Sequence, residues 1–456
     1  MFPDFSQAPA EGLRLIETLN AAGYRAYFVG GCVRDTLMNR RPKDWDICTS
    51  ATPEEILRVF DGWHVIETGL QHGTVTVAVN HVPYEVTTFR VDGVYSDRRH
   101  PDSVRFVTDV REDLARRDFT VNAMAWNPSE GLIDAFGGQE DLRQEIIRAV
   151  GDPAARFGED ALRILRALRF ASVCAFRIEE ETSAAIHRMH PTLNAVAGER
   201  IRAEMARLLC GEAAGEILRS YPDVITGLFP ELAPCVGFDQ RTRWHRYTVW
   251  EHILRTVEAA PSVEAIRWAM LFHDCGKPAV FTVDADGTGH AYGHQEVSRD
   301  LAARAFARLR MDRETAELAL FLIEKHDIPM SSDRALLLRQ LNRFGEDRVR
   351  ALIEVHRADE AGKGIIRPED ADAWASGITA ALDALLAEQP CFTLTDLAVN
   401  GSDLIRAGLR PGKALGETLQ ALLERVMAGK VPNEKAALLM LLPDLPSFQN
   451  SSDVVE

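Results

Sequence analysis

The sequence predicts an α+β protein in which a mixed sheet near the N-terminus is followed by helices alone. Two observations support this. Short runs of β-branched and aromatic residues fill residues 25–90, whereas apolar residues recur at spacings of three and four after Asp141. The chain has 456 residues, of which 46% are hydrophobic and 26% charged. This length exceeds what one hydrophobic core supports, so we expect three or four domains.

Residues 25–90 contain four candidate strands around one helix. The strands are the runs AYFVG, DIC, GTVTVAV and YEVTTF, and the helix begins at Thr52 because an N-cap threonine precedes Pro53 there. Apolar residues alternate from 75 to 79, and the alternation resumes after Asn80-His81, so the last two runs should form an antiparallel hairpin. The sheet is therefore expected to be mixed rather than purely parallel.

The remainder of the chain divides into one long connection and a helical part. Residues 91–118 are rich in arginines and acids and break the periodicity, which is typical of a functional loop. From Asp141 to about Leu442 nearly every segment has the spacing of an amphipathic helix. We expect no strands in this part.

Composition excludes several classes of protein. The formal net charge of −16 argues against a protein that coats nucleic acid through bulk charge, so any such contact must be local. The seven cysteines are scattered and form no CxxC pair, which favours neither a disulfide framework nor structural zinc. Without a signal peptide or an apolar run of 18 residues, we expect a cytoplasmic protein that crosses no membrane.

A diglycine and two aspartates predict a phosphoryl-transfer site. Gly30-Gly31 ends a strand before a helix, where a phosphate can approach the backbone closely and Arg34 favours its charge. Asp44 and Asp46 lie two apart in a segment that we expect to be a strand, so both carboxylates should share a face. Such a pair suits Mg²⁺, and Glu85 on the hairpin could supply a third carboxylate. Alternatively, the glycines form a simple turn and the acids are solvated.

Four motifs in order make this chain resemble the class II nucleotidyltransferases, the family of bacterial CCA-adding tRNA nucleotidyltransferases and poly(A) polymerases. They are GGCVRD, PKDWDICTSATPEE, RRDFTVNAMAW and GEDALRILRALRFA. The resemblance implies a five-stranded head (residues 1–140) followed by a helical neck (141–237), a body (238–365) and a tail (366–456). It further implies that Asp44 and Asp46 bind Mg²⁺, that Gly31, Arg34 and Arg117 hold the triphosphate, and that Asp118 selects ribose.

Asp160 and Arg163 are candidates for reading the incoming base. Three residues apart on a helical segment, they are expected to share a face, and an ordinary surface ion pair is the plain alternative. A carboxylate and a guanidinium together match the amine and ring nitrogen of cytosine and adenine, and reject uracil and guanine. The resemblance assigns them this role. Arg166 and Arg169 would then meet the triphosphate, or could be solvated helix charges.

The segment from Arg90 to His100 resembles the flexible loop with which this family passes from C to A addition. CC-adding members lack it, so its presence favours a CCA-adding or an A-adding enzyme. An ordinary exposed loop is the alternative.

A histidine and aspartate cluster lies between residues 245 and 359, and its spacing resembles the HD phosphohydrolase superfamily. By that resemblance His252, His273, Asp274 and Asp359 would hold a first metal, and His294 and His326 a second. Asp327 competes with Asp359 for the last position. Imidazole ligands suit Mn²⁺, Ni²⁺ or Co²⁺. Lys277 is placed to meet a phosphate.

The sequence thus predicts a Mg²⁺-dependent enzyme that adds C, C and A to tRNA 3′ ends from CTP and ATP without a nucleic-acid template, fused to an HD domain that hydrolyses phosphoesters. The alternatives are an A-adding tRNA nucleotidyltransferase, a poly(A) polymerase, and an HD-type phosphodiesterase with an RNA-binding head. The oligomeric state is not predicted.

Overall fold

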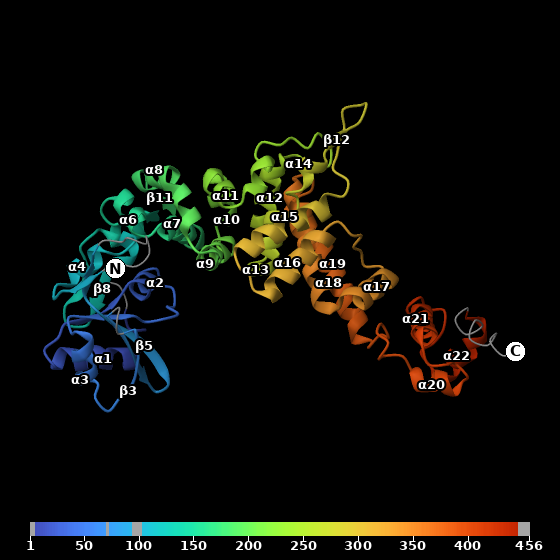
Figure 1. Ribbon diagram of the computed structural model, residues 1–456, viewed down its shortest axis with the longest axis horizontal. Helices are drawn as coiled ribbons and strands as arrows, with labels where there is room; N and C mark the ends of the chain where they lie inside the picture. The colour runs from blue at the N-terminus through green and yellow to red at the C-terminus, as the bar shows by residue number, and fades with distance from the viewer. Residues whose placement is uncertain (1–4, 70–72, 94–102, 446–456) are drawn as a thin grey trace. The chain divides into compact units, whose positions relative to one another are not determined.

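The computed structural model describes residues 5–69, 73–93 and 103–445 (Figure 1). The chain forms two compact units, Met1–Ala233 with Ala305–Met311, and Pro234–Arg304 with Asp312–Glu456. Each unit is described by itself below. The four domain boundaries expected from the sequence stay predictions.

A mixed sheet forms the head of the first unit, as predicted, but it has seven strands rather than five. Their order is β3-β4-β5-β2-β1-β8-β9. Only β2 and β5 run parallel; the other neighbours are antiparallel. In chain order the strands are β1 (Ala26–Val29), β2 (Ile47–Thr49), β3 (His64–Gly69), β4 (Thr74–Val79), β5 (Val82–Thr88), β8 (Met124–Asn127) and β9 (Gly131–Asp134). The second hairpin, β8–β9, extends the sheet beyond β1, which explains the larger strand count.

Helices cover both faces of this sheet. On one face α1 (Ala10–Ala21) and α3 (Pro53–Val59) pack their apolar residues against the buried valines of β4 and against Phe28 (Figure 1). On the other face α4 (Val110–Ala115) packs Leu114 beside Phe89. The Thr52 side chain and Glu55 form a capping box that starts α3, as the sequence predicted. Between β1 and β2 the chain forms helix α2 (Gly31–Leu37).

The predicted hairpin is present and carries Glu85. Strands β4 and β5 are joined by Asn80 and His81, which both have positive φ angles of 50° and 66°, as a tight two-residue turn requires. Tyr84 and Val86 point into the core, and Glu85 between them is exposed. The period-two pattern therefore places this carboxylate on the face of β5 opposite the core that Tyr84 and Val86 join.

The expectation that Asp44-Trp45-Asp46 lies in a strand is wrong, because β2 begins only at Ile47. The segment still runs beside β1, since the Val29 amide donates to the Asp46 carbonyl at 3.0 Å. Trp45 packs edge-on against Phe28 with ring centroids 4.7 Å apart. A packed tryptophan between two polar aspartates thus fixes the segment without a regular strand.

Helices dominate after the head, with small exceptions to the expectation that strands end at Asp141. The exceptions are two short two-stranded pieces, β10 (Ile146–Ile147) with β11 (Arg177–Ile178) and β12 (Thr282–Val283) with β13 (Gly289–His290). A third such piece outside the main sheet, β6 (Arg90–Asp92) with β7 (Val104–Phe106), lies before Asp141. The helices that complete the first unit are α5 (Gly138–Arg143), α6 (Pro153–Glu159), α7 (Leu162–Cys174), α8 (Glu180–Met189), α9 (Gly198–Leu209), α10 (Ala214–Ser220) and α11 (Pro222–Leu228).

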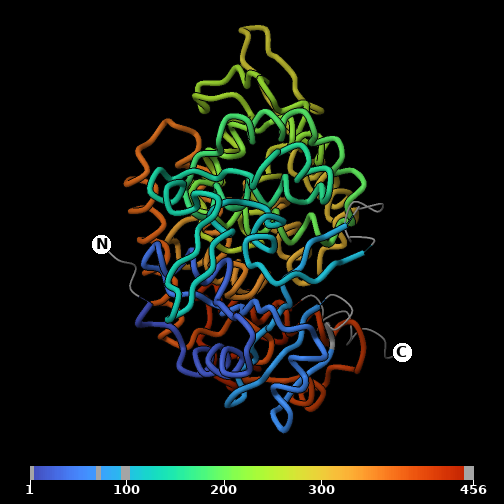
Figure 2. Tube along the Cα trace, turned by 90° about the vertical axis from the view of Figure 1, so that its left-hand side faces the viewer, coloured from blue at the N-terminus to red at the C-terminus, as the bar shows by residue number. Residues whose placement is uncertain are grey.

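The second unit is built from helices, with one short hairpin between α14 and α15. Its helices are α12 (Val249–Ala259), α13 (Glu264–Phe272), α14 (Lys277–Val280), α15 (His294–Arg308), α16 (Arg313–Lys325), α17 (Arg334–Phe344), α18 (Glu346–Lys363), α19 (Pro368–Ala387), α20 (Gly401–Arg406), α21 (Lys413–Met427) and α22 (Lys435–Met440). Helix α18 packs on α12, and α16 packs on α13. The β12–β13 hairpin extends away from the helices, as the yellow loop in Figures 1 and 2 shows.

Two further features concern the cysteines and the helices. All seven cysteines are free thiols. Among the described residues, no helix combines the length and the apolarity that crossing a bilayer requires.

Candidate functional site

A polar cavity of about 390 Å³ in the first unit collects most of the residues predicted to handle the nucleotide. It is lined by Asp46, Glu85, Arg116, Arg117, Asp118, Asp160, Arg163, Arg166 and Arg200, among others. Of the predicted residues, Gly31, Arg34, Asp44 and Arg169 are not among the described residues that line it. The cavity therefore joins the end of the sheet to helices α7 and α9.

Asp46 and Glu85 face one another across two parallel strands. The register pairs Ile47 with Val86, and each carboxylate directly precedes one member of that pair. Burial raises the pKa of Asp46, the charge of Glu85 raises it further, Arg117 lowers it, and Asp44 raises it again. Because the acids repel one another, the group would be stabilised by a divalent cation, so these residues fit the metal that their family implies.

Asp118 is buried and held by four donor groups from three residues. Its Oδ2 accepts from Arg166 Nε at 2.8 Å and from Nη2, and its Oδ1 accepts from the amide of Phe119 and the side chain of Asn122. Burial alone would raise the pKa of Asp118, but the positive charge of Arg166 holds it well below its usual range. The lowered pKa keeps the carboxylate charged at neutral pH, and its hydrogen bonds fix it at the wall of the cavity.

Asp160 and Arg163 both line the cavity, but not as one helix face. Asp160 has an extended backbone between α6 and α7, and its Oδ1 accepts from the Leu162 amide at 3.0 Å. Arg163 is bound to Glu159 at 2.5 Å rather than to Asp160. The expectation of a shared helix face is therefore wrong, and so is the alternative of an ion pair between the two residues. Each side chain is oriented by another partner.

The remaining predicted nucleotide ligands lie around the cavity. Arg34 Nη1 donates to Asn122 at 2.6 Å, and Gly31 begins α2. Gly30 has a φ of 78°, and a Cβ there would lie 2.9 Å from Arg117 Nη1. Only glycine leaves room for the Arg117 guanidinium at this position. Arg169 is buried against Glu204 at 2.9 Å, so its role toward the triphosphate stays a prediction.

Only the start of the predicted flexible loop, Arg90–His100, can be placed. Residues 90–92 form β6, where Asp92 contacts Arg90 at 3.1 Å and Arg116 at 3.6 Å. Residues 94–100 lie outside the described residues. Its role in the change from C to A addition stays a prediction.

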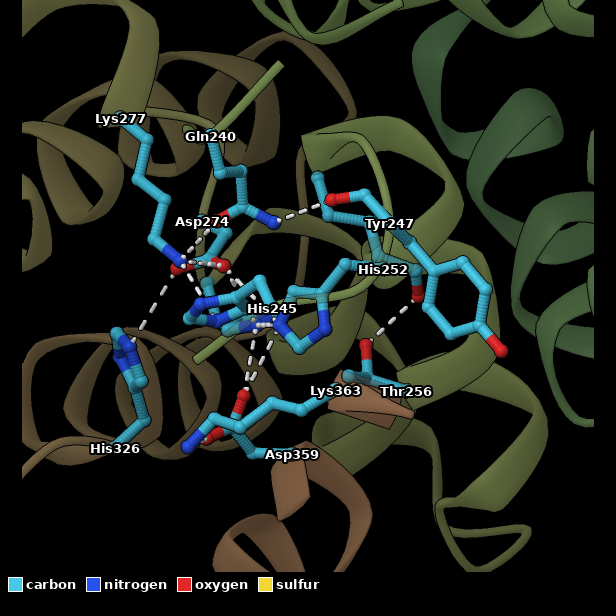
Figure 3. A network of polar contacts seen from close by, with 12 residues as sticks. Gln240, His245, Tyr247, His252, Thr256, Asp274, Lys277, His326, Asp359 and Lys363 are labelled. Carbon is cyan, nitrogen blue, oxygen red and sulfur yellow. Dashed lines mark hydrogen bonds and ion pairs between the residues drawn. The ribbon is translucent and has the colours of Figure 1, made fainter. Parts of the chain in front are cut away.

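The second unit brings the predicted HD residues into one buried cluster (Figure 3). His252 on α12 has its Nε2 atom 3.1 Å from Asp359 Oδ1 on α18 and 3.2 Å from Asp274 Oδ2. His273 Nε2 lies 3.4 Å from the same oxygen of Asp274 and 3.6 Å from Asp359. These four side chains converge on one point, as the ligands of one metal ion would.

Asp274 connects this group to a second one. Its other oxygen, Oδ1, lies 3.1 Å from His294 Nε2 and 3.7 Å from His326 Nε2. Both oxygens are buried and accept no hydrogen bond apart from these close contacts and the Lys277 ammonium, 2.6 Å from Oδ2. One carboxylate between two histidine pairs has the arrangement of a bridging ligand.

Three of the four histidines are oriented by the backbone. His273, His294 and His326 each place Nδ1 at 2.7 to 2.8 Å from the carbonyl oxygen of a residue close before them. A hydrogen on Nδ1 leaves Nε2 as a free lone pair directed into the cluster, which is the form that binds a metal. The donor set of imidazoles and carboxylates therefore fits divalent transition metals.

The structure separates the two candidates for the last ligand. Asp359 is buried beside His252, whereas Asp327 is 49% exposed and its oxygens stay 3.8 Å from His294 and His326. Gln295 donates to Asp327 at 2.6 Å. Burial alone would lower the pKa of His252, but Asp274 and Asp359 raise it to about 9. Asp359 thus belongs to the buried group and Asp327 to its edge.

Sequence reasoning missed several partners that the structure shows. Lys363 Nζ contacts Asp359 at 2.8 Å, and the spacing of four on one helix could have revealed it. Figure 3 shows Lys277 reaching Asp274, and Lys363 reaching Asp359. Arg200 and Glu204 contact residues of α6–α7 from α9, and no local spacing indicates them.

Comparisons with known proteins agree with this geometry. The family model of the poly A polymerase head domain matches residues 26–148, and the HD domain matches residues 245–372. Models of the RNA and SrmB-binding site of polymerase A and of tRNA nucleotidyltransferase domain 2 match residues 175–236 and 373–442. Fold and sites together define a nucleotidyltransferase that also carries an HD domain.

The full-length relatives narrow this class. The chain is 34% identical to the CCA-adding enzyme of Lactobacillus delbrueckii subsp. bulgaricus, over 95% of this chain and 97% of the relative. It is 37% identical to that of Geobacillus thermodenitrificans, over 99% and 100%. The crystal structure of the Bacillus stearothermophilus CCA-adding enzyme in complex with CTP superimposes with a TM-score of 0.73, at 32% identity, over 97% of this chain and 98% of that one. The chain belongs to the family of CCA-adding enzymes.

Proposed function

We propose that this protein adds C, C and A to the 3′ end of tRNA from CTP and ATP, without a nucleic-acid template. One observation carries the proposal: a single cavity places the Asp46 and Glu85 carboxylates beside the guanidinium groups of Arg117 and Arg166. Carboxylates suit the metal of phosphoryl transfer, and the guanidinium groups suit the phosphates. The naming of full-length relatives as CCA-adding enzymes supports the same activity.

The predicted residues in the cavity and around it divide the work of the reaction. Asp44 and Asp46, with Glu85 beside them, would hold Mg²⁺, which neutralises phosphate charge and activates the primer hydroxyl when bound. Arg34 and Arg117, with the backbone at Gly31, hold the triphosphate, and the fixed carboxylate of Asp118 contacts the ribose. The primer 3′ hydroxyl loses its proton to solvent, its oxygen bonds to the α-phosphorus, and the bond between that phosphorus and the leaving pyrophosphate breaks.

Base selection falls to Asp160 and Arg163. Asp160 accepts from the exocyclic amine, and Arg163 donates to the ring nitrogen, a pattern that cytosine and adenine share. Arg200 and Glu159 orient the pair, because they hold its two members from different helices. A wrong base would leave these polar groups unpaired.

Transcripts of tRNA that end before CCA, at C, or at CC test this function when each nucleotide triphosphate is supplied alone. The proposal expects C on the first two and A on the third. A on the third transcript alone would indicate an A-adding enzyme, and long A tails on any RNA would indicate a poly(A) polymerase. Asp46→Ala should abolish all incorporation while leaving tRNA binding near normal.

A specific observation favours a second function, hydrolysis of a phosphoester at the HD cluster. His252, His273, Asp274 and Asp359 would hold one metal, and Asp274, His294 and His326 a second, with Mn²⁺, Ni²⁺ or Co²⁺ as the suited ions. A bound metal supplies an activated water. On a 2′,3′-cyclic phosphate, the water oxygen bonds to phosphorus, the bond to the 3′ oxygen breaks, and that oxygen takes a proton.

This reaction would restore the 3′ hydroxyl that nucleotide addition requires. His273→Ala with Asp274→Ala should end the hydrolysis of a cyclic phosphate and leave CCA addition near normal, because the two sites lie in separate units. Equal hydrolysis by this variant would contradict the second function.

The free thiols support a reducing compartment, and we propose the cytoplasm as the place of action.

A further inference from the structure

Two exposed aromatic rings stand at the cavity beside the histidine and aspartate cluster. The cavity has a volume of about 460 Å³, and Trp244 and Tyr292 line it together with His294, Asp274 and Asp359. The side chain of Trp244 is 61% exposed and that of Tyr292 is 79% exposed. Large aromatic side chains usually bury most of their surface, so two exposed rings at one cavity point to a ligand.

The two rings come from neighbouring loops that are tied together. Trp244 lies in the loop between residues 236 and 248, and Tyr292 follows the β12–β13 hairpin. The Gly289 amide donates to the Arg241 carbonyl at 2.8 Å, and a Cβ on Gly289 would lie 2.4 Å from the Gln240 carbonyl. Figures 1 and 2 both show the two loops side by side. The rings are thus held at the same end of the cavity.

Each ring is also supported from one side. The Arg243 guanidinium lies 4.6 Å from the Trp244 ring centroid. His290 stacks on Tyr292 with centroids 5.2 Å apart and an interplanar angle of 10°. A ring that is backed by a second planar group loses little further freedom when a ligand stacks on it.

Positive charge surrounds these rings in a chain that is acidic overall. Arg241, Arg243 and Arg246 are exposed, and within the described residues none of them has a carboxylate partner. Lys277 and Lys363 line the cavity itself. Exposed aromatic rings among unpaired arginines are typical of surfaces that bind single-stranded nucleic acid.

We propose that Trp244 and Tyr292 form an aromatic rim that stacks the base of a nucleotide whose phosphate ester enters the HD cluster. The ligand class is a nucleoside 2′- or 2′,3′-phosphate, either free or at the end of an RNA. This inference rests on the hydrolytic function proposed above for the same cluster. The rim acts on binding, because it touches the base rather than the reacting phosphate.

Paired substrates test the rim. The full-length protein is assayed with 2′,3′-cyclic AMP, with a short RNA that ends in a 2′,3′-cyclic phosphate, and with glycerol 1,2-cyclic phosphate, which has no base. Trp244→Ala and Tyr292→Ala should each raise KM for the two nucleotide esters by about 5- to 150-fold, the range of one base stack, with little change in kcat. Trp244→Phe and Tyr292→Phe keep a ring and should retain most of the affinity. The base-free ester should be unaffected by all four changes.

A binding measurement tests the rim without catalytic turnover. The affinity of the chelator-treated protein for a labelled pentanucleotide with a 2′-phosphate should fall in the alanine variants and recover in the phenylalanine variants. A larger effect on the RNA than on free cyclic AMP would assign the RNA end as the ligand, and the reverse would assign the free nucleotide.

The outcomes separate the two proposals. Hydrolysis of all three esters with the same KM in wild type and both alanine variants would overturn the rim and leave the hydrolytic function standing. No hydrolysis of any ester, combined with weaker RNA binding in the alanine variants, would overturn the hydrolytic function and support the rim as a binding surface. An increase in KM for the base-free ester equal to that for cyclic AMP would also overturn the rim.

Discussion

Asp160 pairs with Arg200, 40 residues further along the chain, and not with Arg163. Arg200 Nη2 lies 2.8 Å from Asp160 Oδ2, and both side chains are largely buried. Arg200 comes from α9, so the orientation of a residue expected to read the base depends on a helix that lies outside the four family motifs. Base selection therefore should be sensitive to changes in α9.

Arg200→Ala should raise KM for CTP and ATP by roughly tenfold, because Asp160 loses the charged hydrogen bonds that orient it. Discrimination against UTP should weaken as well, since a mobile carboxylate no longer fixes the acceptor position. Single-nucleotide incorporation with each triphosphate measures both effects. Arg188→Ala, an exposed arginine on α8, is the matched control. Unchanged selectivity in Arg200→Ala would show that Asp160 needs no support.

Gly30→Ala should impair triphosphate binding through Arg117. A methyl group at this position would lie 2.9 Å from Arg117 Nη1, on a backbone with φ of 78°. Both the strain and the displaced guanidinium should raise KM for CTP, by about tenfold or more. Gly23→Ala separates the two effects, because its φ is 92° but nothing lies within 4 Å of the added methyl. An equal effect of both variants on KM would argue against the displacement of Arg117.

Asp118→Asn should destabilise the protein at pH 7 by about 2 kcal/mol, because Arg166 loses its charged acceptor. The pKa of Asp118 is held below its ordinary value of about 4, so its contribution is full above pH 4 and is lost as the pH falls through the folded-state pKa. The difference between wild type and variant should therefore narrow from pH 4 downward. Urea midpoints measured from pH 7 to pH 3 test this, with the exposed Asp61→Asn as control. A difference that stays constant would refute the assigned charge.

Asp359→Asn should remove most of the metal bound by the HD cluster, whereas Asp327→Asn should retain it. Asp359 is within 3.1 Å of His252 Nε2, while Asp327 is half exposed and no closer than 3.8 Å to any histidine of the second group. Metal content per chain after loading with Mn²⁺ and gel filtration checks this. Circular dichroism confirms folding. Equal loss of metal in both variants would show that Asp327 is also a ligand.

Much of the fold was predictable because it rests on local patterns. The alternation around Asn80-His81 predicted the hairpin, and the Thr52 capping chemistry predicted α3. The histidines of the HD cluster were found by residue type and order. These features depend on residues close in sequence, where propensity and periodicity carry information.

The wrong expectations concern segments whose spacing suggests one regular element although the backbone leaves that element. GEDALRILRAL reads as one helix, yet α6 ends at Glu159, and Asp160 is extended and accepts from the Leu162 amide. Aspartate commonly accepts from a backbone amide at the start of a helix, so Asp160 was a local signal of this break that the helical spacing concealed. Asp44 and Asp46 were expected on one face of a strand with Trp45 turned into the core. Trp45 does pack against Phe28, but this packing does not require strand pairing. Arg200 and Glu204 could not be predicted, since their partners lie more than 30 residues away.

The position of β2 in the sheet has a consequence for how the protein is made on the ribosome. This strand follows Asp46 and lies between β1 and β5, so one of its neighbours is synthesised only after it. The cavity remains unfinished until Arg200 has emerged, roughly 8 to 30 seconds after Asp46 at bacterial elongation rates of about 5 to 20 residues per second. A nascent chain that stalls within α8 therefore already contains Asp46, Asp160 and Arg163 but lacks Arg200, the residue that holds Asp160 in place. Base selection is then complete only after α9 has been synthesised.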